Sequence, residues 1–185
     1  MKIIVGLTGG SASIFALSVL SGLKKLGIET HFVASKMGEV VLEQELNMSI
    51  NDLSLYCDYI YDNEDLGASI ASGSFNIDGM IVAPCSMRTV AAINNGLSDN
   101  LITRAADVIL KENKKLVLVV RETPFNTVHL KNMLELSQMG TTIFPPIPSF
   151  YNKPETLEDA IVNTTGRILD VIGVKNNLAK RWTGL

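Results

Sequence analysis

The chain has 185 residues, of which 46% are hydrophobic and 19% are charged, and its formal net charge is -3. This length and composition predict one globular domain over residues 1–185 and exclude a disordered chain. The small negative charge argues against a general nucleic-acid binder. No apolar run is long enough to cross a membrane, and two cysteines, Cys57 and Cys85, are too few for a disulfide framework or a zinc site. We therefore expect a cytoplasmic protein that holds no metal.

Short apolar runs alternate with segments of helical periodicity along the chain. In chain order, strands are predicted over residues 2–7, 30–34, 59–61, 80–83, 116–120 and 141–144. Helices are predicted from residue 14 until Gly27 and over residues 36–46, 86–96, 101–111, 125–139 and 155–172. A short helix is expected after residue 51, and a proline-rich loop over 145–154. Continuous apolar strands separated by helices predict an α/β domain, with a parallel sheet covered by helices on both faces.

Polar clusters follow four of the predicted strands directly. They are Gly9-Gly10-Ser11, Ser35, Ser86-Met87-Arg88-Thr89 and Arg121-Glu122. Ligands of parallel sheets bind beyond the carboxyl ends of the strands, so we expect these clusters to meet at one rim.

The segment 79–89 is the most informative of these. Its apolar strand runs into Pro84, which is expected to stop the strand, and Ser86 then caps a helix whose first turn contains Arg88 and Thr89 but no acidic residue. A helix start without its own carboxylate suits a phosphate or another anion. The alternative is an ordinary strand-to-helix loop.

Each of the other candidates has a structural alternative. Gly9-Gly10-Ser11 is neither the dinucleotide fingerprint nor a Walker loop, and it could be only a tight turn. Arg121 suits a phosphate but could pair with Glu122, with Pro124 as the first residue of the next helix. Lys111 lies four residues after Asp107 on one helix, and this spacing usually indicates only an exposed ion pair. Glu45, late in its helix, is by default also an ordinary exposed charge.

Near the end of the chain, Tyr151 follows the prolines, Arg167 lies on the last helix, and Trp182 lies on a tail over about 174–185. A single tryptophan on a tail suits a partner surface or a lid. The residues alone therefore predict an α/β domain that binds a phosphorylated, partly aromatic cofactor at the rim of its sheet, and they leave the chemistry open.

Taken together, the motifs resemble the UbiX-type flavin prenyltransferases, especially the branch called the B subunit of non-oxidative hydroxyarylic acid decarboxylases. The similarity spans almost the whole chain, in the segments 6–16, 72–75, 79–89, 104–112, 121–124, 145–151, 167–170 and 179–184. It implies a flavodoxin-like domain in a dodecamer whose sites are built from adjacent subunits. The implied reaction joins a dimethylallyl group from dimethylallyl monophosphate to reduced FMN, at N5 and then C6, without a metal. The product would serve a UbiD-type decarboxylase.

The resemblance also implies residue roles. FMN would be held by Gly9, Gly10, Ser11, Ser35, Ser86, Met87, Arg88, Thr89 and Arg121. The prenyl phosphate would be surrounded by Lys111, Arg121, Glu122, Tyr151 and Arg167. Glu45, Lys111, Glu122 and Trp182 would be catalytic, with Glu45 in acid–base chemistry and Trp182 closing the site.

Two departures from the family pattern stand out. The usual Gly-Ala-Ser-Gly after the first strand is Gly9-Gly10-Ser11-Ala12, so a shifted turn is expected, and Arg88 replaces a frequent lysine. Two alternatives to a prenyltransferase stay open, a flavin-carrying subunit without catalysis and, more weakly, a flavin-dependent cysteine decarboxylase. The preference between a monophosphate and a diphosphate also stays open.

Overall fold

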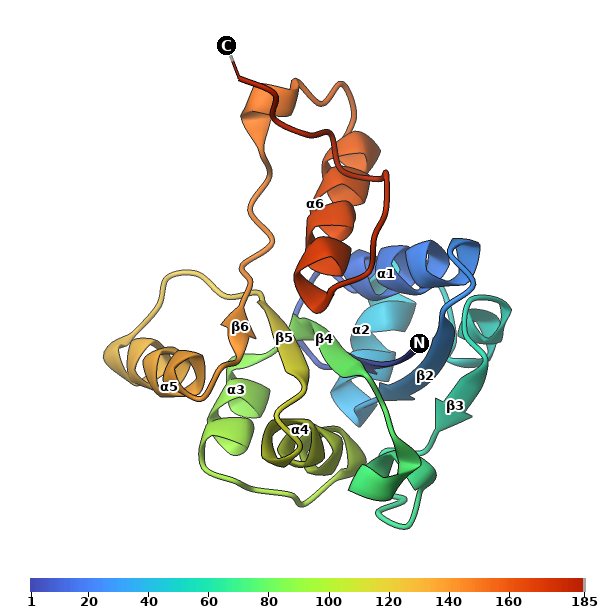
Figure 1. Ribbon diagram of the computed structural model, residues 1–185, viewed down its shortest axis with the longest axis vertical. Coiled ribbons are helices and arrows are strands. Elements are labelled where there is room, and N and C mark those ends of the chain that lie inside the picture. Colours follow the sequence, from blue (N-terminus) through green and yellow to red (C-terminus); the bar gives the residue numbers. More distant parts are fainter. Residues whose placement is uncertain (185) are drawn as a thin grey trace.

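A computed structural model describes residues 1–184 and contains one six-stranded parallel sheet (Figure 1). The strand order is β3-β2-β1-β4-β5-β6, and every described pairing is parallel. The strands are β1 (Lys2–Leu7), β2 (Glu29–Ala34), β3 (Tyr59–Tyr61), β4 (Gly79–Cys85), β5 (Lys115–Val120) and β6 (Thr142–Ile143). The order reverses between β1 and β4, and such a switch point is where doubly wound sheets form their ligand crevice.

Helices cover both faces of the sheet, as the alternating pattern predicts. The helices are α1 (Ile14–Lys25), α2 (Lys36–Leu46), α3 (Met87–Asn94), α4 (Leu101–Lys111), α5 (Thr127–Gln138) and α6 (Leu157–Ile172). Apolar side chains of α1, α2 and α6 form one core against the sheet, and those of α3, α4 and α5 form a second core on the other face. Between these two layers the central strands β1, β4 and β5 are almost completely buried.

Five of the six helices begin at a side-chain cap, which fixes where each chain segment leaves the sheet. Ser35, Ser86, Asn100, Asn126 and Thr156 each accept a hydrogen bond from a backbone N–H in the first turn. Such caps stabilise a helix by about 1 kcal/mol each. Helix α1 differs, because its cap residue Ser13 makes no side-chain cap hydrogen bond.

Some predicted boundaries are wrong. Pro84 does not stop its strand: β4 continues through it to Cys85, and a register shift between Val82 and Cys85 accommodates the proline in the pairing with β5. Pro124 is not the first residue of α5, because that helix begins at Thr127 behind the Asn126 cap. β6 is two residues long instead of four, and α6 begins two residues later than expected.

An arm extends from the body of the domain beyond the first turn of α6 (Figure 1). We define it as residues 145–156, with a short 3-10 helix at Phe150–Asn152, together with the C-terminal residues 180–184. The two segments of the arm are joined by a hydrogen bond from Lys180 Nζ to the Asn152 carbonyl and by an edge-to-face contact of Tyr151 with Trp182. The rest of the tail returns along α6, where Asn163 accepts from the Lys180 N–H.

Candidate functional site

The loops that follow β1, β2, β4 and β5 meet at one rim, as predicted. Gly9 lies so close to the start of α2 that a Cβ atom there would be 2.7 Å from Met37 Cβ, and a Cβ on Gly10 would lie 3.4 Å from Pro84 Cβ. The Ser35 N–H donates to the Leu7 carbonyl, which joins the second loop to the first. The rim therefore brings together the predicted flavin residues Gly9, Gly10, Ser11, Ser35, Ser86 to Thr89 and Arg121.

Thr8 joins the two loops at the switch point, and the sequence interpretation missed it. Its hydroxyl donates to the Pro84 carbonyl over 2.8 Å and accepts from the Ser86 N–H over 2.8 Å, and the residue is buried. This pair of hydrogen bonds fixes the end of β1 against the turn into α3. A threonine directly after an apolar strand and before two glycines could have marked this position as a candidate. Its hydrogen-bond partners could not be predicted, because they lie 76 and 78 residues away in the sequence.

Glu45, in the last turn of α2, binds the loop that precedes α1. Its Oε1 accepts from Ser11 Oγ over 2.6 Å, its Oε2 accepts from the N–H and the Oγ of Ser13 over 2.7 Å each, and the Ala12 N–H lies 3.0 Å from both oxygens. Partial burial raises the pKa of this carboxyl, but the hydrogen bonds from Ser11, Ser13 and Ala12 outweigh it and lower the pKa below its ordinary value. Glu45 thus lies in the site as an ionised acceptor.

The first turn of α3 keeps the properties that suit an anion. Ser86 accepts from the Thr89 N–H, its hydroxyl lies 3.1 Å from Thr89 Oγ1, and no acidic residue stands in this turn. The Arg88 guanidinium instead contacts Asp99 over 3.3 Å at the surface. Cys85, directly before Ser86, is no nucleophile, because complete burial raises its pKa.

Arg121 and Glu122 are exposed at the same rim, after β5. The Arg121 N–H donates to the Cys85 carbonyl, which places its backbone beside the turn into α3. Glu122 accepts from the Thr123 N–H over 2.9 Å. None of the ion pairs within residues 1–184 joins Arg121 to Glu122. The guanidinium of Arg121 is therefore available at the rim.

The remaining predicted substrate residues lie elsewhere in the chain. Lys111 is the last residue of α4 and lies near the amino end of β5, at the end of the sheet opposite the rim. It pairs with Glu112 over 2.9 Å instead of with Asp107. Asp107 pairs with Arg104. Tyr151 and Trp182 lie in the arm, more than half exposed, and Arg167 pairs with Asp170 on α6 over 2.6 Å.

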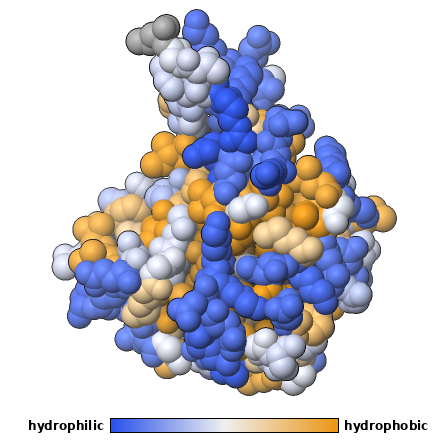
Figure 2. All heavy atoms as spheres, viewed as in Figure 1, coloured by the Kyte–Doolittle hydropathy of each residue, from blue (hydrophilic) through white to orange (hydrophobic). Residues whose placement is uncertain are grey.

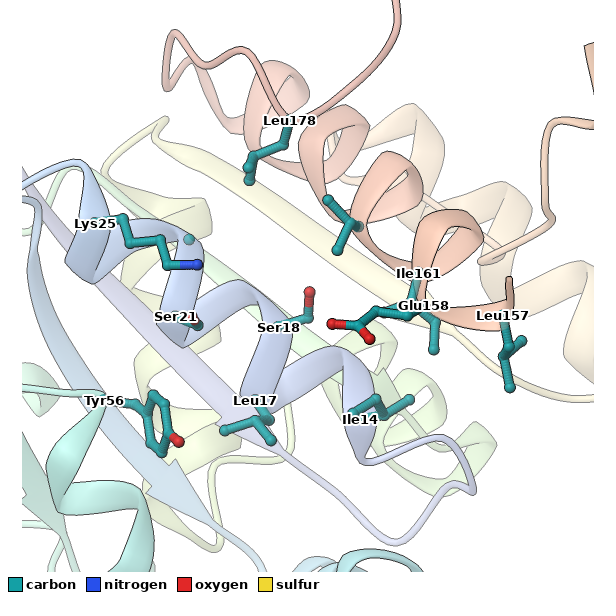
Figure 3. A pocket seen from close by; sticks show the side chains of 12 residues that line it. Ile14, Leu17, Ser18, Ser21, Lys25, Tyr56, Leu157, Glu158, Ile161 and Leu178 are labelled. Carbon is teal, nitrogen blue, oxygen red and sulfur yellow. The ribbon is translucent and has the colours of Figure 1, made fainter. Parts of the chain in front are cut away.

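A largely apolar groove of about 640 Å³ lies between α1 and α6 (Figure 3). Ile14 of α1 lies near Leu157 of α6, and the Ser18 hydroxyl and the Glu158 carboxylate point toward each other across the groove. Over residues 1–184, no three His, Cys, Asp or Glu side chains come together to hold a metal ion, and no helix is long and apolar enough to cross a membrane.

The chain is similar to known flavin-dependent proteins over its whole length. The model of the Flavoprotein family matches residues 1–176. A probable UbiX-like flavin prenyltransferase from Bacillus subtilis (strain 168) is 49% identical over 185 residues, which cover 100% of this chain and 91% of the relative.

Solved structures agree with these relatives. AnUbiX (PadA1) in complex with FMN and dimethylallyl pyrophosphate superposes with a TM-score of 0.97 at 44% identity, covering 100% of this chain and 98% of that one. A dodecameric FMN-dependent UbiX-like decarboxylase from Escherichia coli O157:H7 superposes with a TM-score of 0.96 at 46% identity, covering both chains completely. The peptidyl-cysteine decarboxylase EpiD, at 19% identity and a TM-score of 0.65, shares the fold alone. The chain therefore belongs to the Flavoprotein family and, within it, to the UbiX-type flavin prenyltransferases.

Proposed function

We propose that this protein transfers a dimethylallyl group from its phosphate ester to reduced FMN. The observation that carries the proposal is the rim at the β1/β4 switch point, where a helix start without an acidic residue, a close-packed glycine loop and a free arginine lie side by side. The relatives named as flavin prenyltransferases, and the neighbour that binds FMN and dimethylallyl pyrophosphate, support it.

Of the two helix starts at the switch point, we assign the FMN phosphate to α3. The start of α1 already has an anion, because the Glu45 carboxylate accepts from the N–H groups of Ala12 and Ser13. The start of α3 has unpaired backbone N–H groups, two hydroxyls and no carboxylate, and these donors fit a phosphate monoester. The loop Gly9–Gly10–Ser11 then lies beside the rest of the flavin.

The phosphate of the prenyl donor needs residues from more than one copy of the chain. Lys111 ends α4 at the turn that leads into β5, and Arg121 directly follows the last residue of that strand, so the six residues of β5, roughly 20 Å, lie between them. One phosphate cannot contact both side chains of a single chain. We therefore propose that Arg121 and Glu122 of one copy face Lys111 of a second, and that Tyr151, Trp182 and Arg167 also reach the site of a neighbouring copy.

The exposed apolar surface supports such an assembly. In the arm and at the start of α6, Ile147, Phe150 and Leu157 are exposed by 73%, 76% and 76%. Apolar atoms also show in patches across the body of the molecule (Figure 2). We propose a second copy as the occupant of the groove between α1 and α6, and a dodecamer as the complete assembly, as in the relative from Escherichia coli O157:H7.

The residues then have distinct tasks. Reduced FMN supplies the electron-rich ring atoms that accept the dimethylallyl group. When the carbon–oxygen bond to the phosphate breaks, the phosphate leaves with the electron pair, and Lys111, Arg121 and Arg167 stabilise its negative charge. The faces of Tyr151 and Trp182 would shield the allylic positive charge from water, and Glu122 at the rim would accept the proton that the flavin ring gives up when its carbon takes the dimethylallyl group. We further propose that the product serves a UbiD-type decarboxylase.

Anaerobic incubation with reduced FMN and either dimethylallyl monophosphate or dimethylallyl pyrophosphate, followed by mass analysis of the bound flavin, tests the proposal. We expect a mass gain of one dimethylallyl group, and the faster ester identifies the donor. Arg121→Ala and Lys111→Ala should each abolish the gain. Bound but unmodified FMN with both esters, beside a competent control enzyme, would instead indicate a flavin carrier without catalysis.

A further inference from the structure

The loop between β1 and α1 contains a residue in a strained backbone conformation. Ala12 has a φ of 79°, in the left-handed region, where the Cβ atom of an L-residue is crowded. Glycine adopts this region without cost, but this chain has alanine there. Such a conformation persists only where the surrounding contacts enforce it.

The contacts around Ala12 come from one side chain. Glu45 accepts hydrogen bonds from Ser11, Ala12 and Ser13, the strained residue and its two neighbours. Ser13 is completely buried, and Glu45 is the acceptor for both its N–H and its hydroxyl. Without the carboxylate, both donors would be buried without this partner, which is costly.

Glu45 also replaces the cap that α1 lacks. Ser13, at the start of α1, makes no side-chain cap hydrogen bond, and the first turn of this helix has no acidic residue. A carboxylate from α2 therefore supplies the negative charge that a helix start favours. Because α2 is itself fixed at its start by the Ser35 cap and by the contact of Gly38 with the Leu7 backbone, Glu45 is held on a rigid element.

We propose that Glu45 is a positioning residue, which holds Ala12 in its left-handed conformation and so fixes the loop 9–13 for flavin binding. The inference rests on the proposed flavin site. It is carried by the contacts of the carboxylate: four donors, all from residues 11–13, surround it, and the Ala12 N–H is shared between Oε1 and Oε2.

The test combines Glu45→Gln with Ala12→Gly, because glycine removes the backbone cost that the carboxylate offsets. The control is Glu43→Gln, an exposed glutamate on the same helix with no described hydrogen bond to the loop. Two quantities are measured on the full-length protein: the affinity for FMN, by quenching of flavin fluorescence, and hydrogen exchange of the peptide covering residues 8–17 without flavin.

We expect Glu45→Gln to weaken FMN binding about tenfold or more and to speed exchange in this peptide. Adding Ala12→Gly should recover most of both changes, and Glu43→Gln should resemble the wild type. Neither readout depends on prenyl transfer, so a failure of the proposed reaction would leave this result interpretable.

Two outcomes would overturn the inference. The first is a Glu45→Gln variant that binds FMN and exchanges like the wild type, because the loop would then not depend on the carboxylate. The second is a double variant as impaired as Glu45→Gln alone, because the strain at Ala12 would then not be what Glu45 offsets.

Discussion

At the scale of single residues, the site depends on polar side chains that tie one loop to another. Thr8 binds residues 76 and 78 positions away. Ser13 and Glu45, which are 32 positions apart, bind each other. None of them has to touch a ligand to matter, since each sets the position of a loop that does. Mutations at such residues are expected to lower stability and ligand affinity together.

Thr8→Val should show this coupling. Valine keeps the shape but leaves the part-buried Ser86 N–H without its acceptor, which costs about 1 kcal/mol or more in the free energy of unfolding. Urea unfolding measures this cost, and FMN titration should show weaker binding because Ser86 starts the helix assigned to the phosphate. Thr142→Val, at a half-exposed position in β6 with no described side-chain hydrogen bond, is the matched control. Equal stability of the two variants would contradict the role of Thr8.

The sequence predicted which residues gather at the rim but not how they are connected. Ser35 and Ser86 were predictable, because a hydroxyl between a strand and a helix is a local signal. The Glu45 contacts were not, because they join residues 32 to 34 positions apart and depend on how α2 packs beside α1. The departure at Ala12 predicted a shifted turn, and this shift stays a prediction; the positive φ of Ala12 is a separate feature that the sequence did not indicate.

At the scale of elements, the order of strands and helices follows from the alternation of apolar runs, and it is confirmed along the chain. The misplaced boundaries involve Pro84 and Pro124, where local rules expect a strand end and a helix start. Tertiary pairing overrides the first, since a register shift lets β4 continue to Cys85 beside β5. The arm was predicted as a stiff loop, but its contact with the tail was not, because Tyr151 and Trp182 are 31 positions apart.

Asp170 on α6 anchors the tail, and this contact has a predictable pH dependence. It pairs with Arg181 and Arg167, and the hydrogen bond from Arg181, the largest contribution, lowers its pKa despite partial burial. A lowered pKa means that the ion pairs contribute fully above the ordinary carboxyl value of about 4 and are lost as the pH falls through the lower folded value.

Trp182 is the single tryptophan of the chain, so its fluorescence anisotropy reports the tail directly. We expect constant anisotropy from neutral pH down to about 5 and a decrease at lower pH. Asp170→Asn should show the lower anisotropy already at neutral pH. Glu155→Gln, an exposed carboxyl in the arm, should behave as the wild type. An Asp170→Asn protein with wild-type anisotropy at neutral pH would show that other contacts hold the tail.

At the scale of the whole molecule, the predicted substrate residues form no common site within one chain. Lys111 lies before the amino end of β5, Arg121 follows its carboxyl end, and Tyr151 and Trp182 lie in the arm that projects from the body of the domain (Figure 1). A dispersed set of this kind becomes a site only when symmetry brings different copies together. The exposed apolar side chains of the arm have the same explanation, because they need a partner surface to be buried.

Mixed assemblies of two inactive variants test this directly. Lys111→Ala and Arg121→Ala are each expected to be inactive alone. If a site takes Arg121 from one copy and Lys111 from another, co-expression of the two variants at equal levels restores both wild-type residues in about a quarter of the sites. If both residues came from one chain, every site would carry one of the two mutations and the mixture would stay inactive.

Because co-assembly is required, each variant carries a different affinity tag and only doubly purified material is assayed. Prenylated FMN at about a quarter of the wild-type yield would establish shared sites, whereas an inactive mixed assembly would show that Lys111 and Arg121 of each site come from one chain.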